Sequence, residues 1–448
     1  MPTSRSPTSR REIALLAGAI LLAGTLVVAG YRVDSAGAFW GGLLALSAAT
    51  GPLAFALGRG RWRDGVLVTG ICVAISIGVF VAGELAWRAL AGSRAEGAAR
   101  RVAGRVFSFD AARANPKAFV DFWDRHLAQM KQAPWVMADP RGVNPYVLRP
   151  GARGALHDSE VRINQLGFRG REISVDKGEV FRIVALGEST TFGVTAEPGD
   201  RPWPEVLEDR IRRELVCDVP VEVINAGVPG WTLANQRGRM ESDILPLHPD
   251  LILSYHGYNG FPWFFGTLPG LPFLPPPRVP PRPSRLLEGA EKAWRLRALR
   301  ERYARELDRS VLQTDVSTTA YADEYRSLIR LARSQGALLA LATFNMAVNE
   351  SSPEEVVDFY AQSFPEVRSA ILANQLHTRL LRQLPKPPGV HLIDTAPGVD
   401  GEYRELFIDL IHFTQPGRDR LAGNFLNGIR EILGSHPRLR CRPAARPG

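Results

Sequence analysis

Short apolar runs and amphipathic segments alternate along the second half of the chain. The runs have the length of buried strands, and the segments between them have helical periodicity. The predicted strands are Phe181 to Leu186, Val221 to Ile224, Leu251 to Tyr255, Leu338 to Thr343 and Val390 to Ile393. The predicted helices are Trp203 to Leu215, Leu233 to Ile244, Tyr321 to Ser334, Glu354 to Leu384 and Gln415 to Leu433. This alternation predicts an α/β fold, a three-layer α/β/α sandwich around a five-stranded parallel sheet.

A different pattern occupies the first 90 residues. Three apolar stretches there each have about the 20 residues that a membrane-spanning helix needs: Ile13 to Tyr31, Ala36 to Leu57 and Gly65 to Trp87. We therefore expect three transmembrane helices before the sandwich. An alternative remains open for the first stretch, because the basic residues before it and Ala36-Gly37-Ala38 after it are also typical of a cleaved secretory signal.

Basic residues around these stretches predict an orientation, because short loops rich in Lys and Arg tend to stay in the cytoplasm. Arg10 and Arg11 precede the first stretch, and Arg59, Arg61 and Arg63 separate the second from the third. We expect a multi-pass protein of the cell (inner) membrane with residues 90–448 on the periplasmic face. Glu84, inside the third stretch, has two open interpretations: pairing with another helix or an interface, and function.

Composition divides the chain into four predicted parts. They are a membrane anchor at 1–90, a linker and lead-in at 91–178, the α/β domain at 179–435 and a flexible tail at 436–448. Two insertions are expected within the domain, a Pro-rich one at 262–283 and a helical one at 284–312. The first is interpreted as a lid or pocket wall, or as a structural loop. The second is interpreted as a helix on anionic headgroups, or as one packed on its own domain.

Charge and cysteine content restrict the partners. The net charge of +9 comes from Arg spread along the whole chain, without a basic motif interleaved with aromatic residues, so no nucleic-acid partner is expected. No metal-ligand cluster, phosphate loop or dinucleotide fingerprint occurs, and we expect neither metal nor cofactor. Cys217 and Cys441 are interpreted either as one disulfide or as two free thiols.

Chemistry is expected where the strands end, because ligands of such sheets bind beyond the carboxyl ends of the strands. Gly187-Glu188-Ser189 follows the first strand, in a sharp turn that presents Ser189 at the start of a helix. The N–H groups there favour a developing oxyanion, although the same residues also suit an ordinary helix cap. Gly227 and Asn259 follow the next two strands, and each is interpreted as an oxyanion donor or as a turn residue.

A carboxylate and an imidazole precede the last helix at a spacing of three residues, as Asp409 and His412. Asp409 is predicted to fix the tautomer of His412 while His412 accepts a proton from Ser189. Each of the other seven histidines lacks an acid at this spacing after a strand.

Four short blocks, taken together, resemble the SGNH (GDSL-like) hydrolase superfamily of flavodoxin-like fold. They are Gly187-Glu188-Ser189, Gly227, Gly257-Tyr258-Asn259 and Asp409-x-x-His412, in the family's order. Asn164-Gln165-Leu166-Gly167-Phe168-Arg169-Gly170 is similar to the lead-in of membrane-bound bacterial members. The resemblance implies that Ser189 is the nucleophile, that His412 and Asp409 complete the catalytic triad, and that Ser189, Gly227 and Asn259 form the oxyanion hole. Glu188 departs from the family, which has Asp there.

Three functions follow from this resemblance. The first is a serine esterase that deacylates a cell-envelope glycan or lipid. The second is an O-acyltransferase of envelope polysaccharide, in which a sugar hydroxyl resolves the acyl-enzyme. The third is a catalytically silent envelope scaffold that keeps the fold. The expected partners are an acyl-ester substrate and, through the N-terminal helices, membrane lipid.

Overall fold

The structure is a computed structural model of the 448-residue chain. It describes residues 10–32, 38–46, 70–71, 73–85, 133–156, 159–194, 199–265, 268, 270–272, 274 and 283–444. The chain divides into two compact units, one made of 1–97 with 275–299 and one made of 98–274 with 300–448.

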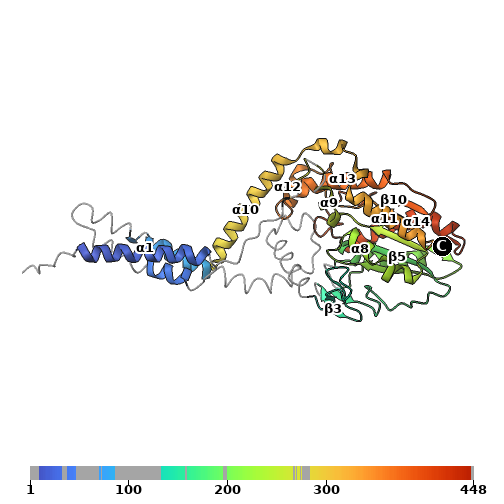
Figure 1. The fold of residues 1–448 in the computed structure, drawn as a ribbon, viewed down its shortest axis with the longest axis horizontal. Helices are drawn as coiled ribbons and strands as arrows, with labels where there is room; N and C mark the ends of the chain where they lie inside the picture. The colour runs from blue at the N-terminus through green and yellow to red at the C-terminus, as the bar shows by residue number, and fades with distance from the viewer. Residues whose placement is uncertain are drawn as a thin grey trace, which may run out of the picture. The chain divides into compact units, whose positions relative to one another are not determined.

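A parallel sheet forms the centre of the second unit (Figure 1). Its five strands are β5 (Phe181–Gly187), β7 (Val221–Gly227), β8 (Leu251–Tyr255), β9 (Leu338–Ala342) and β10 (Val390–Ile393). They lie in the order β10-β9-β8-β5-β7, and every neighbouring pair is parallel. Every residue of β5 is buried, as expected of a strand covered on both faces. The predicted five-stranded α/β sandwich is confirmed.

Two groups of helices pack on this sheet. Helix α7 (Trp203–Glu214) packs on α14 (Gln415–Ser435) through the stacked rings of Trp203 and Phe425, whose centroids are 4.2 Å apart. Helix α8 (Leu233–Gly238) packs on α11 (Ala320–Ser334). The Tyr325 hydroxyl lies 2.7 Å from Nε2 of His377 and links α11 to α13 (Val367–Gln383).

Two predicted helices are interrupted. The segment predicted as one helix from 354 to 384 is two, α12 (Glu354–Tyr360) and α13, because Pro365 between them lacks the N–H that a continuous helix needs. The helix predicted from 233 to 244 ends as α8 at Gly238, and a π-helical turn, Met240–Ile244, follows. The remaining short helices are α6 (Ser189–Phe192), α9 (Pro262–Phe265), Leu245–Leu247, Tyr258–Gly260, Arg309–Gln313 and Val316–Thr318.

The described part of the lead-in forms two small antiparallel sheets. One joins β1 (Val136–Met137) to β2 (Val147–Leu148), and the other joins β3 (Arg153–Leu156) to β4 (Ser159–Arg162). Trp135 and Phe168 are buried in the same core as the central sheet. The described residues of the segment 133–178 therefore pack as part of the α/β unit.

The first unit contains α1 (Arg10–Arg32) and the start of α10 (Arg285–Glu306). Glu84 is 1 % exposed, and its carboxylate accepts hydrogen bonds from the Ser284 hydroxyl and from the backbone N–H groups of Arg285 and Leu286 at 2.9–3.0 Å. The first N–H groups of a helix have no acceptor within the helix, so Glu84 caps α10. This contact fits the interpretation of Glu84 as paired with another helix.

The prediction of three transmembrane helices, and with it a multi-pass membrane localisation, is corrected. The side chains of α1 are described over 17–29, and the helical residues described from the second and third predicted spans are 38–46, 70–71 and 73–85. Within the described ranges, no helix has the length and apolar character of a membrane span. The rest of the predicted spans, and most of the Pro-rich insertion, lie outside the described residues.

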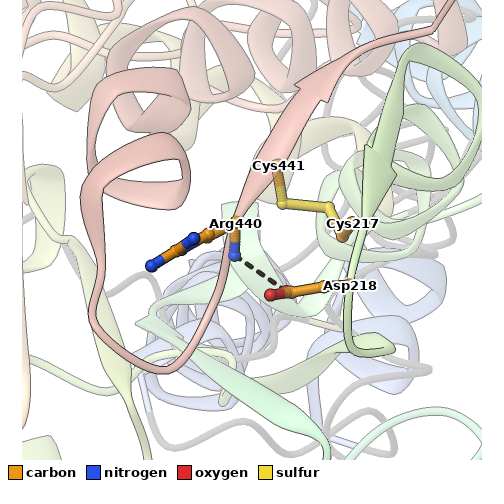
Figure 2. The surroundings of a disulfide bond; sticks show 4 residues. All are labelled: Cys217, Asp218, Arg440 and Cys441. Atoms are coloured by element: carbon orange, nitrogen blue, oxygen red, sulfur yellow. Dashed lines mark hydrogen bonds between the residues drawn. A yellow bond between two sulfur atoms is a disulfide. The ribbon is translucent and has the colours of Figure 1, made fainter.

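A disulfide joins Cys217 to Cys441, which decides between the two interpretations of these cysteines (Figure 2). Cys441 belongs to β11 (Cys441–Pro443), which pairs antiparallel with β6 (Leu215–Cys217). Asp218 accepts the Arg440 N–H at 2.8 Å beside the bridge. Residues 441–443, expected to belong to a flexible tail, are thus a strand covalently attached 224 residues upstream.

We expect the disulfide to stabilise the α/β unit. Closing a loop of this length removes conformational freedom from the unfolded chain, which is worth about 2–5 kcal/mol for native disulfides. Reduction with dithiothreitol, or the double substitution Cys217→Ser and Cys441→Ser, should lower the free energy of unfolding by that amount in a urea titration. The double variant is the matched control, because the reductant should leave its transition unchanged. Equal midpoints for reduced and oxidised wild type would contradict the expectation.

Candidate active site

The turn that joins β5 to α6 carries Ser189 as the first residue of a four-residue helix. Gly187 is required just before it, since a Cβ there would lie 2.0 Å from Oγ1 of Thr191 and 2.7 Å from the Tyr255 carbonyl oxygen. The N–H groups of Ser189 and Thr190 begin the helix, so they have no acceptor within it. We call residues 187–194 the nucleophile turn.

Ser189, His412 and Asp409, predicted as a triad, lie in one hydrogen-bonded line. Oγ of Ser189 lies 2.8 Å from Nε2 of His412, and Nδ1 of His412 lies 2.7 Å from Oδ2 of Asp409. All three side chains are buried, with 9, 6 and 0 % of each residue exposed. In this arrangement the imidazole is able to take the serine proton while the carboxylate stabilises the resulting positive charge.

The loop before α14 fixes the acid and the base with its own backbone. Oδ1 of Asp409 accepts the N–H groups of Ile411 and His412 at 2.7 and 2.8 Å, so both carboxylate oxygens are bonded. The His412 carbonyl in turn accepts the Ile408 N–H at 2.8 Å. Such a closed loop holds the imidazole in one orientation.

Glu188 links the nucleophile turn to the loop after β8. Its carboxylate accepts the N–H of Gly257 at 3.0 Å through Oε1 and the N–H of Asn259 at 3.1 Å through Oε2. Burial raises the pKa of the Glu188 carboxyl to about 7, although the two N–H bonds lower it. Sequence reasoning treated this residue only as a departure from the family pattern. It anchors the backbone of Asn259.

Asn259 lies beside the segment that follows β7. Its Nδ2 donates to the Trp231 carbonyl at 2.9 Å, which uses one of its two amide protons. Gly257 is needed nearby, since a Cβ there would lie 2.2 Å from the ring of Phe344. The predicted donor Asn259 is therefore held at both its backbone and its amide.

Gly227 does not fit the donor role expected of it. Its N–H donates to Oδ1 of Asn225 at 3.0 Å, and a Cβ there would lie 2.2 Å from the backbone nitrogen of Phe192. Glycine is needed because the end of β7 packs directly against α6. Asn225 completes the contact, since its Nδ2 donates to the Thr191 carbonyl at 2.9 Å. Sequence reasoning could have found Asn225, because it is a polar side chain inside a strand whose residues are all buried.

Gly230 fits the role of an oxyanion donor better than Gly227 does. It is exposed, with a φ of +76°, and it immediately precedes Trp231, whose carbonyl binds Asn259. A Cβ on Gly230 would lie 2.5 Å from the hydroxyl of Tyr146, which donates to the Pro229 carbonyl at 2.6 Å. The second glycine of the Gly227-Val228-Pro229-Gly230 sequence therefore lies in an open turn next to Asn259.

A cavity of about 420 Å³ lies behind the nucleophile turn, between the lead-in, α7 and β7. Arg169, Asn225 and Pro202 are among its lining residues, whereas Ser189 and His412 are not. Across the ranges that the structure describes, no group of three or more His, Cys, Asp and Glu side chains is arranged to hold a metal ion.

The model of the GDSL-like lipase/acylhydrolase family matches residues 185–420. Among solved structures, the chain is similar to a GDSL-like lipase from Bacteroides thetaiotaomicron, with 14% identity and a TM-score of 0.30 over 56% of this chain and 89% of that one. It is also similar to the lipase/acylhydrolase from Enterococcus faecalis, with 16% identity and a TM-score of 0.31 over 59% and 98% of the two chains. A third similar structure is an acetyl-xylooligosaccharide esterase from Geobacillus, with 15% identity and a TM-score of 0.33 over 57% of this chain and 96% of that one. No curated protein sequence matches the chain.

We expect Glu188 to make the stability of the α/β unit depend on pH. Between its ordinary pKa of 4.5 and the folded pKa of about 7, the folded state keeps the proton that the unfolded chain has lost. Unfolding then releases a proton, so the free energy of unfolding falls as the pH rises through this window. Between pH 4.5 and 7, the free energy of unfolding of the wild type should fall by about 3 kcal/mol relative to that of Glu188→Gln, as measured by urea unfolding.

The surface carboxylate Glu402 offers a matched control, and Glu402→Gln should follow the wild-type curve. Curves of wild type and Glu188→Gln that stay parallel from pH 4.5 to 8 would refute the assignment.

Proposed function

Because the chain belongs to the GDSL-like lipase/acylhydrolase family and is an SGNH-type serine hydrolase, we propose that it cleaves carboxylic esters with Ser189 as the nucleophile. One observation carries the proposal: the continuous contact from Oγ of Ser189 through the His412 imidazole to the Asp409 carboxylate, at 2.8 and 2.7 Å. The intact line of contacts disfavours the alternative of a catalytically silent scaffold.

The first step is attack on the ester. Oγ of Ser189 forms a bond to the carbonyl carbon while its proton passes to Nε2 of His412, and the carbonyl π electrons move onto the oxygen. Asp409 stabilises the imidazolium through its bond to Nδ1. When the tetrahedral intermediate collapses, the C–O bond to the alcohol breaks and His412 returns the proton to the leaving oxygen. The product is an acyl-enzyme on Ser189 and a free alcohol.

The second step removes the acyl group. Water loses a proton to Nε2 of His412 and attacks the same carbonyl carbon, and the proton then returns to Oγ of Ser189 as the carboxylic acid leaves. A sugar hydroxyl in place of water would give acyl transfer, so the O-acyltransferase alternative uses the same residues. Product analysis with an acyl donor and a glycan acceptor separates the two, because hydrolysis releases only free acid.

The oxyanion hole that we propose is made by the N–H of Ser189, the amide of Asn259 and the N–H of Gly230. Gly230 replaces Gly227, whose N–H is already bonded to Asn225. The Asn259 amide keeps one proton after its bond to Trp231, and Glu188 holds its backbone. Fixed donors of this kind stabilise charge that develops in the transition state without reorganising during the reaction.

The natural substrate is defined by its acyl group and its alcohol. The sequence suggested a cell-envelope glycan or lipid, chiefly because the domain was expected to face outward from a membrane anchor. With that expectation corrected, the substrate class that the family assignment supports is an acyl ester. Acetylated glycans and short-chain lipid esters are its natural tests.

We expect Ser189→Ala and His412→Ala to abolish labelling of the protein by a fluorophosphonate, which reacts with an activated serine whatever its natural substrate. Asp409→Asn should lower kcat for p-nitrophenyl acetate by about 10⁴-fold, the loss known for an acid replaced in another serine triad, because the imidazole takes the wrong tautomer. Gel fluorescence and initial rates provide the measurements. A folded wild type that is neither labelled nor active would refute the proposal.

Asn259→Ala should lower kcat by about 10²- to 10³-fold, the loss typical of removing one oxyanion donor, with little change in KM. Asn424→Ala is the matched control, because the Asn424 amide donates only to the Thr395 and Pro397 carbonyls in the described contacts and should leave kcat unchanged. Equal rates for the two variants would remove Asn259 from the oxyanion hole.

A further inference from the structure

The conspicuous segment Asn164 to Gly170, which precedes the sheet, forms a closed loop. Oδ1 of Asn164 accepts the N–H groups of Leu166 and Phe168 at 3.0 and 2.9 Å, and its Nδ2 donates to the Arg171 carbonyl at 3.0 Å. One side chain thereby satisfies three backbone groups and fixes the direction in which the loop presents Phe168 and Arg169.

Arg169 attaches this loop to the edge of the sheet. Its N–H donates to the Asn225 carbonyl at 3.2 Å, and Asn225 lies on β7, the last strand in the sheet order. The same Asn225 holds the Thr191 carbonyl and the Gly227 N–H. The loop therefore contacts the sheet at the residue that already supports the nucleophile turn.

The side chain of Arg169 reaches behind the nucleophile turn. Its Nη1 donates to the Phe192 and Gly193 carbonyls at 2.7 and 2.5 Å, and its guanidinium carbon lies 4.5 Å from the centre of the Phe192 ring. Arg169 is only 6 % exposed. Burial lowers the pKa of its guanidinium to about 10, far enough above neutral pH that the charge remains.

A second buried arginine completes the arrangement from the other end of the chain. Arg418 of α14 donates to the Val194 carbonyl and forms an ion pair with Asp200 at 3.1 Å. The carbonyls of residues 192–194, directly after the single turn of α6, are thus all bound by guanidinium groups. Cations are favourable at the carboxyl end of a helix, where the carbonyls lack acceptor partners.

We propose that Arg169 is a positioning residue of the active site, which fixes the nucleophile turn from behind and makes the lead-in loop 164–170 part of the catalytic unit. The inference rests on the proposed role of Ser189. A helix of one turn has little stability of its own, so the position of Ser189 depends on what holds its carboxyl end. A displacement of about 1 Å in a reacting group costs about 100-fold in rate.

The test compares Arg169→Met with Arg182→Met. Arg182 is also buried, but it lies at the amino end of β5, where it binds the Ser174 and Leu247 carbonyls and Glu222. Both variants should lose stability. Only Arg169→Met should lower kcat for p-nitrophenyl acetate, by about 100-fold with KM unchanged. It should lower the rate of fluorophosphonate labelling per folded molecule by about the same factor.

Chemical rescue gives a second readout that a merely structural role would not move. The cavity of about 420 Å³ is lined by Arg169, so an added small cation is able to reach the space that Arg169→Ala vacates. Guanidinium chloride, far below denaturing concentrations, should restore labelling of Arg169→Ala at least tenfold. Sodium chloride at the same ionic strength should not, and neither salt should speed labelling of the wild type.

The outcomes are distinct. Slow labelling of Arg169→Met, restored by guanidinium in Arg169→Ala, supports the inference. Labelling of Arg169→Met as fast as that of Arg182→Met overturns it, while a wild type that is not labelled overturns the proposed function instead. If neither Arg169→Met nor Arg169→Ala folds, Arg169→Lys decides between the outcomes. This variant keeps the charge but lacks the flat guanidinium group over the Phe192 ring. A labelling rate equal to that of the wild type would overturn the inference.

Discussion

The active site depends on one steric constraint: the adjacent strands β5 and β7 both end at glycines that have no space for a side chain. A Cβ at Gly187 would lie 2.0 Å from Thr191, and one at Gly227 would lie 2.2 Å from the backbone of Phe192. The turn carrying Ser189 therefore lies directly on the sheet, with no side chain between them. At such close range its position is set by the strands themselves, and the polar groups around it have to be satisfied by side chains that come from elsewhere.

Side chains of the turn itself and of distant parts of the chain each hold a backbone group. Glu188 binds the N–H of Asn259, and Gln236 of α8 donates to the carbonyls of Gly187 and Ala226 at 2.7 and 2.8 Å. The lead-in makes a second contact besides Arg169, because Phe168 lies under the guanidinium of Arg239, which also lies over the Trp231 ring. The Trp231 carbonyl binds Asn259. The proposed catalytic groups are thus supported by one continuous polar and aromatic layer.

The strands and the order of the site motifs were predictable because both depend on local pattern. Buried parallel strands are nearly continuous apolar runs, and Ser189, Asn259 and Asp409 follow strands or precede a helix at recognisable spacings. Arg169 and the role of Glu188 were not predictable, since their partners lie 23 and 69 residues away and nothing in the local sequence names them. The sequence pointed to Gly227 as the donor because a pattern of residues does not reveal which N–H is already bonded. The membrane prediction rested on apolar stretches and flanking charge alone, and it is overturned because no helix in the described part of the chain is long and apolar enough to cross a membrane.

The long separation between Ser189 and His412, the proposed nucleophile and base, has a consequence during synthesis. Ser189 leaves the ribosome 223 residues before His412, which at about 5–20 residues per second is roughly 10 to 45 s. Throughout that interval the nascent chain contains the serine without its imidazole, and the carbonyl of Val194 without Arg418. Under the proposed mechanism, a chain interrupted by stalling or cleavage before residue 409 lacks the acid and the base, so it does not attack esters in the compartment where it is made.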